Sequence, residues 1–285
     1  MAEIDPRRAS DYDDRATGAV KSVLVEIGQV LGSYRDRFAV IGGAVPWLLL
    51  TGSDMPHVGT LDVDLTLDAE ALCDGDYARL VDALLSQGYR QGEDRRRFQL
   101  VRTVPARDGG PDIDVVVDFL MPRDATIAKN VPPLVADFAV QPADGAGLAL
   151  ISHKSVEIDG DMPGGGRNRV RIAVASIPAL LAMKGYAIAD RLKQKDAYDI
   201  YYSIRNFPGG MEALVAETEP LLKFESARTG YLHVAEKFRH PDDFGPTSVR
   251  QFVDRPDMLE ERTADQWQQD AFGQVDAWLS ALGLR

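Results

Sequence analysis

Residues 38–68 contain the two stretches FAVIGGAVPWLLL and GTLDVDLTLD, which decide the fold of the first half of the chain. An apolar run ends on Gly42 and Gly43, an amphipathic segment follows, and Asp62 and Asp64 flank a valine inside a second apolar run. This order predicts a strand, a glycine turn, a helix and a second strand. Residues two apart on a strand point to the same face, about 7 Å apart, so both carboxylates are expected to face one spot.

Two carboxylates on one face, next to a glycine turn that opens a helix, suit a nucleoside triphosphate bound with Mg²⁺. Magnesium prefers oxygen ligands, keeps several waters and is completed by substrate phosphates. The backbone N–H groups that begin a helix have no partners within it and can bind the same phosphates. Either feature alone is common, since Asp-x-Asp also occurs on solvated strands and in calcium loops. The combination in this order favours a nucleotide site.

A further group of carboxylates lies in residues 112–122, which read DIDVVVDFLMP. This segment is expected to form a hairpin with the strand that ends at Val104. Asp112, Asp114 and Asp118 share one face of it by the period of two. One additional carboxylate beside the first pair would complete a two-metal site for phosphoryl transfer. A solvated hairpin edge is the alternative, and it suits Asp112 best.

The glycine pair followed by Asp-hydrophobic-Asp on a strand resembles the DNA polymerase beta-like nucleotidyltransferase superfamily. The resemblance implies that Gly42 and Gly43 bind a nucleoside triphosphate and that two Mg²⁺ ions are held by three aspartates. Members carry the third aspartate in an apolar strand that runs into a proline or a turn, which points to Asp118 and leaves Asp114 as the alternative. The metal ligands expected from the resemblance are therefore Asp62, Asp64 and Asp118.

A second group of charged residues lies in residues 184–200, KGYAIADRLKQKDAYDI. On one continuous helix Lys184, Arg191 and Lys195 would fall within about 40° of one another and form a basic stripe. Such a stripe is usually a solvated helix face. The pattern is, however, similar to that of AbiEii-type toxins, which carry Lys-x-x-Ala-x-x-x-Arg followed by Lys-Asp-x-x-Asp. The matching residues are Lys184, Ala187, Arg191, Lys195, Asp196 and Asp199.

This second resemblance implies a role for each charged residue. Lys184 would reach the triphosphate, with Lys195 also on the nucleotide side, and Arg191 would support a phosphate or an acceptor strand. Asp196 and Asp199 would orient the basic residues or help to position the attacking hydroxyl.

Two positions depart from the superfamily pattern. Ala44 stands where many members have Ser or Thr after Gly-Gly, and Val58 stands where many have an arginine. Both departures weaken the expected nucleotide binding, and neither affects the metal ligands.

The resulting fold class is α+β, with a nucleotidyltransferase-type mixed β-sheet flanked by helices and then a C-terminal helical domain. The expected boundaries are 1–175 for the catalytic domain and 176–285 for the helical domain. Short extra strands are expected within residues 122–170 and a flexible loop at 159–169. The expected helices include 16–34, 69–87, 179–192, 211–222, 225–238 and 264–282, with a loop at 239–256 and with residues 193–206 as either a continuation or a separate helix.

Composition restricts the possible partners. The chain has 285 residues, one cysteine (Cys73) and a formal net charge of −12, which opposes nonspecific binding to nucleic acid. An RNA substrate would require local basic patches to converge; the candidates are Arg95–Arg97, the arginines 167, 169 and 171, and Lys193 with Lys195. The three arginines are expected on one side of a strand, where a solvated strand face is the equally favoured alternative to phosphate binding. No apolar run is long enough for a membrane span and no signal-peptide core is present, so a cytoplasmic protein is expected.

The resemblance implies the toxin of a toxin–antitoxin or phage-defence pair. It would transfer a nucleoside monophosphate to an RNA, such as the acceptor end of tRNA, and it would have a cognate antitoxin. Transfer to a small molecule of the aminoglycoside type is one alternative, and a non-catalytic nucleotide-binding regulatory protein is another. His57 is expected to be a loop residue without a catalytic role.

Overall fold

The computed structural model describes residues 6–34, 37–53, 55–68, 76–91, 98–106, 108–125, 140–255, 258–259 and 262–285. The expectations for Cys73 and for Arg95–Arg97 lie outside these residues.

The chain forms two compact units that alternate along the sequence. A sheet unit contains residues 14–45 and 59–176, and a helical unit contains residues 1–13, 46–58 and 177–285. The helical unit therefore resumes at Ile177, close to the boundary expected from the sequence. It also includes two earlier segments that a division at 175 assigns to the catalytic domain. The assignment of 1–175 as a catalytic domain and 176–285 as a helical domain stays a prediction.

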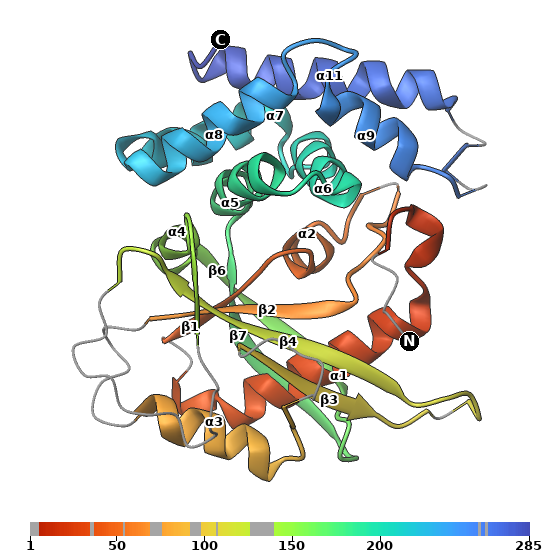
Figure 1. The fold of residues 1–285 in the computed structure, drawn as a ribbon, viewed down its shortest axis with the longest axis vertical. Helices are drawn as coiled ribbons and strands as arrows, with labels where there is room; N and C mark the ends of the chain where they lie inside the picture. Colours follow the sequence, from red (N-terminus) through yellow and green to blue (C-terminus); the bar gives the residue numbers. More distant parts are fainter. Residues whose placement is uncertain are drawn as a thin grey trace. The chain divides into compact units, whose positions relative to one another are not determined.

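The sheet unit is built on a mixed β-sheet (Figure 1). Its strands are β1 (Phe38–Ile41), β2 (Asp62–Leu67), β3 (Gln99–Val104), β4 (Ile113–Pro122), β5 (Gln141–Ala143), β6 (His153–Asp161) and β7 (Arg167–Ala175). The order is β3-β4-β2-β1-β7-β6, with β5 also pairing with β4. The pairs β2–β4 and β1–β7 are parallel, whereas β1–β2, β3–β4 and β6–β7 are antiparallel. The mixed sheet and the β3–β4 hairpin are as predicted from the sequence.

The helix α1 (Asp14–Val30) covers the apolar face of this sheet. Gly28 of α1 packs directly on the side chains of Val170 and Ile172, with no room for a Cβ atom. Val40 of β1 is level with Leu65 of β2 and with Val174 of β7, so these residues share the α1 face. The alternate residues of β2 and β4 consequently point to the opposite face.

The other helices of the sheet unit are shorter. They are η2 (Gly32–Tyr34), α3 (Asp76–Ser86) and α4 (Ala146–Ile151), and the six-residue α2 (Ala44–Leu49) contains the point at which the chain leaves the unit. In Figure 1, α1 and α3 lie on one side of the sheet and α4 on the other. The expected helix 69–87 is described from Asp76 onward, and its earlier residues lie outside the described part.

One prediction for residues 122–170 was wrong and another was confirmed. The segment 159–169 is not a flexible loop, because β6 and β7 extend to Asp161 and from Arg167 and are joined by a tight turn. The turn is closed by the Met162 N–H, which donates to the Gly166 carbonyl at 2.9 Å. The short extra strands expected in this range are present as β5 and β6, whereas residues 146–151, AGLALI, form the helix α4; its six residues are too few to show a helical period.

The helical unit begins its main run at Ile177. Its helices are η1 (Ala9–Asp11), α5 (Ile177–Asp190), α6 (Gln194–Arg205), α7 (Gly210–Thr218), η3 (Glu219–Lys223), α8 (Glu225–Lys237), α9 (Phe244–Phe252) and α11 (Ala264–Ala281). Gly185 of α5 and Gly230 of α8 allow these two backbones to approach closely, since a Cβ on Gly185 would lie 1.8 Å from the Gly230 carbonyl oxygen. Among the described residues, no helix is both long and apolar enough to cross a lipid bilayer.

One further prediction for this unit was wrong. The loop expected at 239–256 contains α9, whose first turn carries Pro246, a residue that is tolerated only near a helix start. Of the two alternatives for residues 193–206, the structure has the separate helix, because α5 ends at Asp190 and α6 begins at Gln194. The basic stripe that depended on a continuous helix is therefore absent.

Candidate functional site

The three predicted metal ligands share one face of the sheet. Asp62 and Asp64 are two residues apart on β2, and Asp118 of the parallel neighbour β4 is in register with Asp64. All three are partly exposed and lie on the face opposite α1. The strand register therefore brings together the carboxylates that the sequence singled out.

The predicted glycine turn lies directly against this carboxylate group. Gly42 has φ +71°, and a Cβ on it would fall 1.9 Å from Asp64 Oδ2. Only a residue without a side chain allows the backbone and this carboxylate to come so close. The Val45 N–H is used within the turn, where it donates to the Gly42 carbonyl at 3.2 Å.

The aspartate side chains bind neighbouring polar groups. Thr60 Oγ1 donates to Asp62 Oδ1 at 2.8 Å, and Gln99 Nε2 donates to Asp118 Oδ1 at 2.9 Å. In the part of the chain that the structure describes, no three His, Cys, Asp or Glu side chains converge closely enough to hold a metal ion. The donor set and its common face fit Mg²⁺, whereas the present side-chain directions do not form a closed metal site.

The alternative third ligands lie elsewhere on the hairpin. Asp114 is exposed, and Arg90 Nη2 donates to its Oδ2 at 2.8 Å. Asp112 accepts from the Ala106 N–H at 2.9 Å, a turn contact that agrees with its expected place at a solvated edge. The register therefore places Asp118, and not Asp114, beside Asp64. Its role as a ligand stays a prediction.

The helical unit contains a second, buried cluster formed by Lys184 of α5 with Lys195, Asp196 and Asp199 of α6. Lys184 Nζ donates to Asp196 Oδ1 at 2.6 Å and lies 2.7 Å from Asp199 Oδ2. Lys195 Nζ donates to Asp199 Oδ1 at 2.8 Å. The turn between the two helices, and not a common helix face, brings these residues together.

Mutual attraction keeps the cluster ionised. Burial raises the pKa of Asp199, but Lys184 and then Lys195 outweigh it, and the pKa lies well below its usual range. Burial lowers the pKa of Lys184, but Asp196 and Asp199 outweigh this effect and raise it. Two buried cations thus face two buried anions, and the pairs offset the cost of removing each charge from water.

Arg191 is the exposed part of the cluster. Its Nε donates to Asp196 Oδ2 at 3.0 Å, and its Nη2 lies 3.3 Å from Oδ1. Its side chain is 61% exposed, whereas that of Asp196 is 1% exposed. Asp196 therefore holds the guanidinium in one orientation and leaves most of it accessible to a ligand.

The cluster also contains His57, which sequence reasoning missed. Its side chain is 1% exposed, and Nε2 lies 3.0 Å from Asp199 Oδ1. His57 does lie outside helices and strands, as expected, but it is buried. The two residues are 142 positions apart in the sequence, and no local pattern in a single chain connects them.

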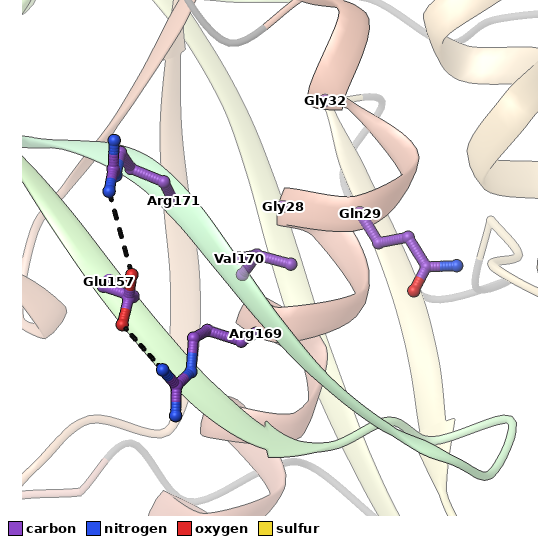
Figure 2. A pocket seen from close by; sticks show the side chains of 7 residues that line it. All are labelled: Gly28, Gln29, Gly32, Glu157, Arg169, Val170 and Arg171. Carbon is purple, nitrogen blue, oxygen red and sulfur yellow. Dashed lines mark ion pairs between the residues drawn. The ribbon is translucent and has the colours of Figure 1, made fainter.

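Two of the predicted basic patches do not form among the described residues. On the β6–β7 hairpin, Arg169 and Arg171 lie 3.5 and 3.8 Å from the carboxylate of Glu157 (Figure 2). Arg167 of the same strand pairs with Asp159. Each arginine has an acidic residue in register on the facing strand. This ladder of opposite charges supports the solvated strand face that was the alternative. Lys195 is buried in the helical unit and cannot belong to an exposed patch.

The structure combines a mixed sheet, a glycine turn against a strand carboxylate, an aspartate in register on the next strand and a lysine–aspartate helix pair, the features for which the sequence predicted a nucleotidyltransferase. The family model described as Nucleotidyl transferase AbiEii toxin, Type IV TA system, matches residues 29–278, and the chain belongs to this family. A toxin of such a system has a cognate antitoxin.

Two further comparisons complete this result. The crystal structure of JHP933 from Helicobacter pylori is similar at 10% sequence identity, with 95% of this chain and 94% of that chain covered and a TM-score of 0.45. The chain matches none of the curated proteins with which its sequence was compared.

Proposed function

We propose that this protein transfers a nucleoside monophosphate from a nucleoside triphosphate to an acceptor hydroxyl, with Mg²⁺ held by Asp62, Asp64 and Asp118. The observation that supports this most directly is the register of Asp64 with Asp118, with the Gly42 backbone against the same carboxylate. Three oxygen donors suit Mg²⁺, and a glycine turn without a side chain lets a triphosphate approach the backbone.

The chain's own residues would divide the work. Asp62 and Asp118 would exchange their bonds from Thr60 and Gln99 for the cation, and Asp64 would hold it beside the Gly42 turn. When bound there, Mg²⁺ would neutralise phosphate charge and favour ionisation of the acceptor hydroxyl. The acceptor oxygen would bond to the α-phosphorus as its bond to pyrophosphate breaks, and the hydroxyl proton would pass to solvent; the carboxylates would act as metal ligands.

In the helical unit, Arg191 is the residue best suited to meet a phosphate or an acceptor strand, since it is charged, exposed and held by Asp196. Lys184 is nine-tenths buried and bound by two carboxylates. To reach a triphosphate it would have to replace one of them with a phosphate oxygen. Its contribution to phosphate binding would therefore depend on a rearrangement of the cluster.

For the acceptor we propose an RNA such as tRNA, because the family consists of toxins and a nucleotide added to the acceptor end of tRNA would halt translation. A small polycationic acceptor of the aminoglycoside type is the second candidate. The net charge of −12 and the paired arginines of the β6–β7 hairpin favour it. Ala44, which provides no hydroxyl after Gly-Gly, keeps nucleotide binding without turnover as a third outcome of the test.

The test is incubation of purified protein with Mg²⁺, each α-³²P-labelled nucleoside triphosphate in turn, and either total RNA or an aminoglycoside as the acceptor. We expect label in an RNA band, and we expect it to disappear in a double variant with Asp62→Ala and Asp64→Ala. A matched control is Asp114→Asn, which removes a carboxylate from the same sheet face but away from Asp64.

Each result has a definite meaning. Full transfer by the double variant would overturn the proposed site. Transfer to an aminoglycoside but not to RNA would establish the second candidate. Binding of nucleotide with no transfer to either acceptor would establish a protein that binds without reacting.

A further inference from the structure

His57 lies in a connecting segment, yet its side chain is buried against two tyrosine rings and a carboxylate. Its ring stacks on Tyr198, with centroids 5.6 Å apart and planes at 29°, and meets the edge of Tyr202 at 4.8 Å. Its Nε2 faces Asp199 Oδ1 at 3.0 Å. A buried imidazole with two aromatic walls and a carboxylate partner has little freedom to rotate.

The protonation states around His57 define which atom donates. Asp199 is ionised and can only accept, so His57 Nε2 carries the hydrogen. Burial, and next the charge of Lys195, lower the pKa of His57 to about 4, so the ring is neutral at physiological pH. His57 is thus an uncharged donor to a carboxylate that also binds two lysines.

We propose that His57 is a positioning residue for nucleotide transfer, which orients the Asp199 carboxylate and, through it, Lys184 and Lys195. The inference rests on the proposed function, in which the lysine–aspartate cluster takes part. It adds to the site a residue that touches neither nucleotide nor metal in that scheme.

The geometry of Asp199 explains why a third donor matters. Its Oδ1 accepts from Lys195 and faces His57, while its Oδ2 pairs with Lys184. With two flexible lysines as the only donors, the Asp199 carboxylate could rotate about its Cβ–Cγ bond. The fixed His57 ring restricts this rotation and so defines the plane of the carboxylate. A neutral donor achieves this without adding a positive charge, so the net charge of the cluster is unchanged.

The segment that carries His57 is held by the same helix. The Tyr202 hydroxyl donates to the Met55 carbonyl at 2.7 Å and lies 2.6 Å from the Ser53 hydroxyl. Tyr202 is three residues after Asp199, so the two side chains lie on the same face of α6. Asp199 binds the His57 ring, and Tyr202 binds the backbone of the same segment at Met55. His57 is therefore placed by α6 itself.

Two variants separate hydrogen bonding from packing. His57→Phe keeps an aromatic ring but has no donor, and His57→Gln keeps an N–H donor near the position of Nε2. With α-³²P-labelled nucleoside triphosphates, Mg²⁺ and total RNA, we expect His57→Phe to lower kcat at least about 10-fold with KM for the nucleotide within about threefold. We expect His57→Gln to stay within about threefold of the unaltered protein. Wild-type rates in His57→Phe, or equal losses in both variants, would overturn the inference.

A second measurement does not depend on turnover. The ¹⁵Nζ–H signals of Lys184 and Lys195, assigned with Lys→Arg variants, report whether each ammonium group is held by its carboxylate. We expect the Lys195 signal to be retained in His57→Gln and lost or shifted in His57→Phe. If the unaltered protein transfers no nucleotide, the proposed function fails by itself. Unchanged lysine signals in His57→Phe would then overturn the role of His57.

Discussion

Asp114 and Asp118 lie on the same face of β4, four residues apart, and their surroundings differ. Asp118 is level with Asp64 on the adjacent strand, whereas Asp114 is exposed and bound by Arg90. The period of a strand cannot distinguish the two, because both face the same way. The pairing of β2 with β4, which depends on the whole sheet, provides the distinction.

Substitution of these two aspartates tests the proposed metal site. We expect Asp118→Asn to lower nucleotide transfer on the order of 100-fold or more, because the amide removes a negative oxygen from the set that would bind Mg²⁺. Asp114→Asn should change it less than about threefold. Initial rates with the preferred nucleoside triphosphate provide the measurement, and equal losses in both variants would contradict the assignment.

His57 should make stability depend on pH. The unfolded chain takes up a proton on this residue near pH 6.5, and the folded chain does so only near pH 4. Between these values the unfolded state binds more protons, so stability is complete above pH 6.5 and falls as the pH decreases. The charged groups that face His57 are Asp199, Lys195 and Lys184. The lowered pKa of Asp199 and the raised pKa of Lys184, each set by the opposite charges of the cluster, keep these two groups ionised in this range.

From the two pKa values we expect a loss of about 2 kcal/mol between pH 7 and pH 5. Urea denaturation at pH 7, 6 and 5 measures it, and His57→Gln should lack this part of the pH dependence. An identical slope in the variant would show that His57 titrates normally in the folded protein.

Local sequence was enough to locate most of the candidate residues. The glycine turn at residues 42–43 and the aspartate pair at 62 and 64 lie within one short stretch, and Lys184, Arg191, Asp196 and Asp199 follow a spaced motif, so each was found without the fold. His57 was missed because its partner is 142 positions away and because a single histidine in a connecting segment has no distinguishing pattern.

At the scale of elements, the break between α5 and α6 changes the arrangement of the residues in the predicted helical motif. A continuous helix would have exposed Lys184, Arg191 and Lys195 as one stripe. The turn at residues 191–193 instead buries both lysines against α6 carboxylates and leaves Arg191 accessible. No Gly or Pro marks this turn, so sequence patterning had no signal for it.

The β6–β7 hairpin is the corresponding case among the strands. The arginine alternation was visible in the sequence, but the acidic residues that pair with it belong to a segment expected to be partly loop. Once β6 and β7 are in register, Glu157 faces Arg171 and Asp159 faces Arg169. Neutralised in this way, the hairpin is a weak candidate for phosphate binding.

The close crossing of α5 and α8 leads to a stability prediction. We expect Gly185→Ala to destabilise the protein by about 2 kcal/mol or more, because the new Cβ would overlap the Gly230 carbonyl and force the helices apart. Gly273→Ala in α11 is the control, since no atom lies within 4 Å of its Cβ position. It should be neutral or stabilising by about 0.5–1 kcal/mol. Denaturant midpoints of both variants test this, and a neutral Gly185→Ala would contradict the crossing.

At the scale of the whole molecule, the two units are not successive pieces of sequence. The sheet unit is interrupted by residues 46–58, which belong to the helical unit, as do residues 1–13. Composition and helical patterning predicted a change from strands to helices at residue 176. They could not predict that residues 1–13 and 46–58 belong to the same compact unit as the later helices. Such membership depends on long-range contacts, like that of Tyr12 with Phe252 at 5.9 Å.

A fragment made from residues 177–285 should therefore be incomplete. It would lack His57, whose ring contacts Tyr198 and Tyr202, and it would lack Tyr12, whose ring contacts Phe252. We expect it to melt with lower cooperativity and to bind a hydrophobic dye at 25 °C. Thermal circular dichroism and dye fluorescence, with the full chain as control, test this. A fragment that melts as sharply as the full chain would show that the early segments are dispensable.

Because α6 binds the segment around His57, residues 177–285 cannot be exchanged between relatives without residues 46–58. A chimera between two relatives with a single junction near residue 176 would combine Asp199 and Tyr202 of one parent with a residue 53–57 segment of the other. Recombination that moves residues 46–58 together with 177–285 would keep these partners matched. We therefore expect residues 46–58 and residues 177–285 to be inherited together as relatives of this protein diverge.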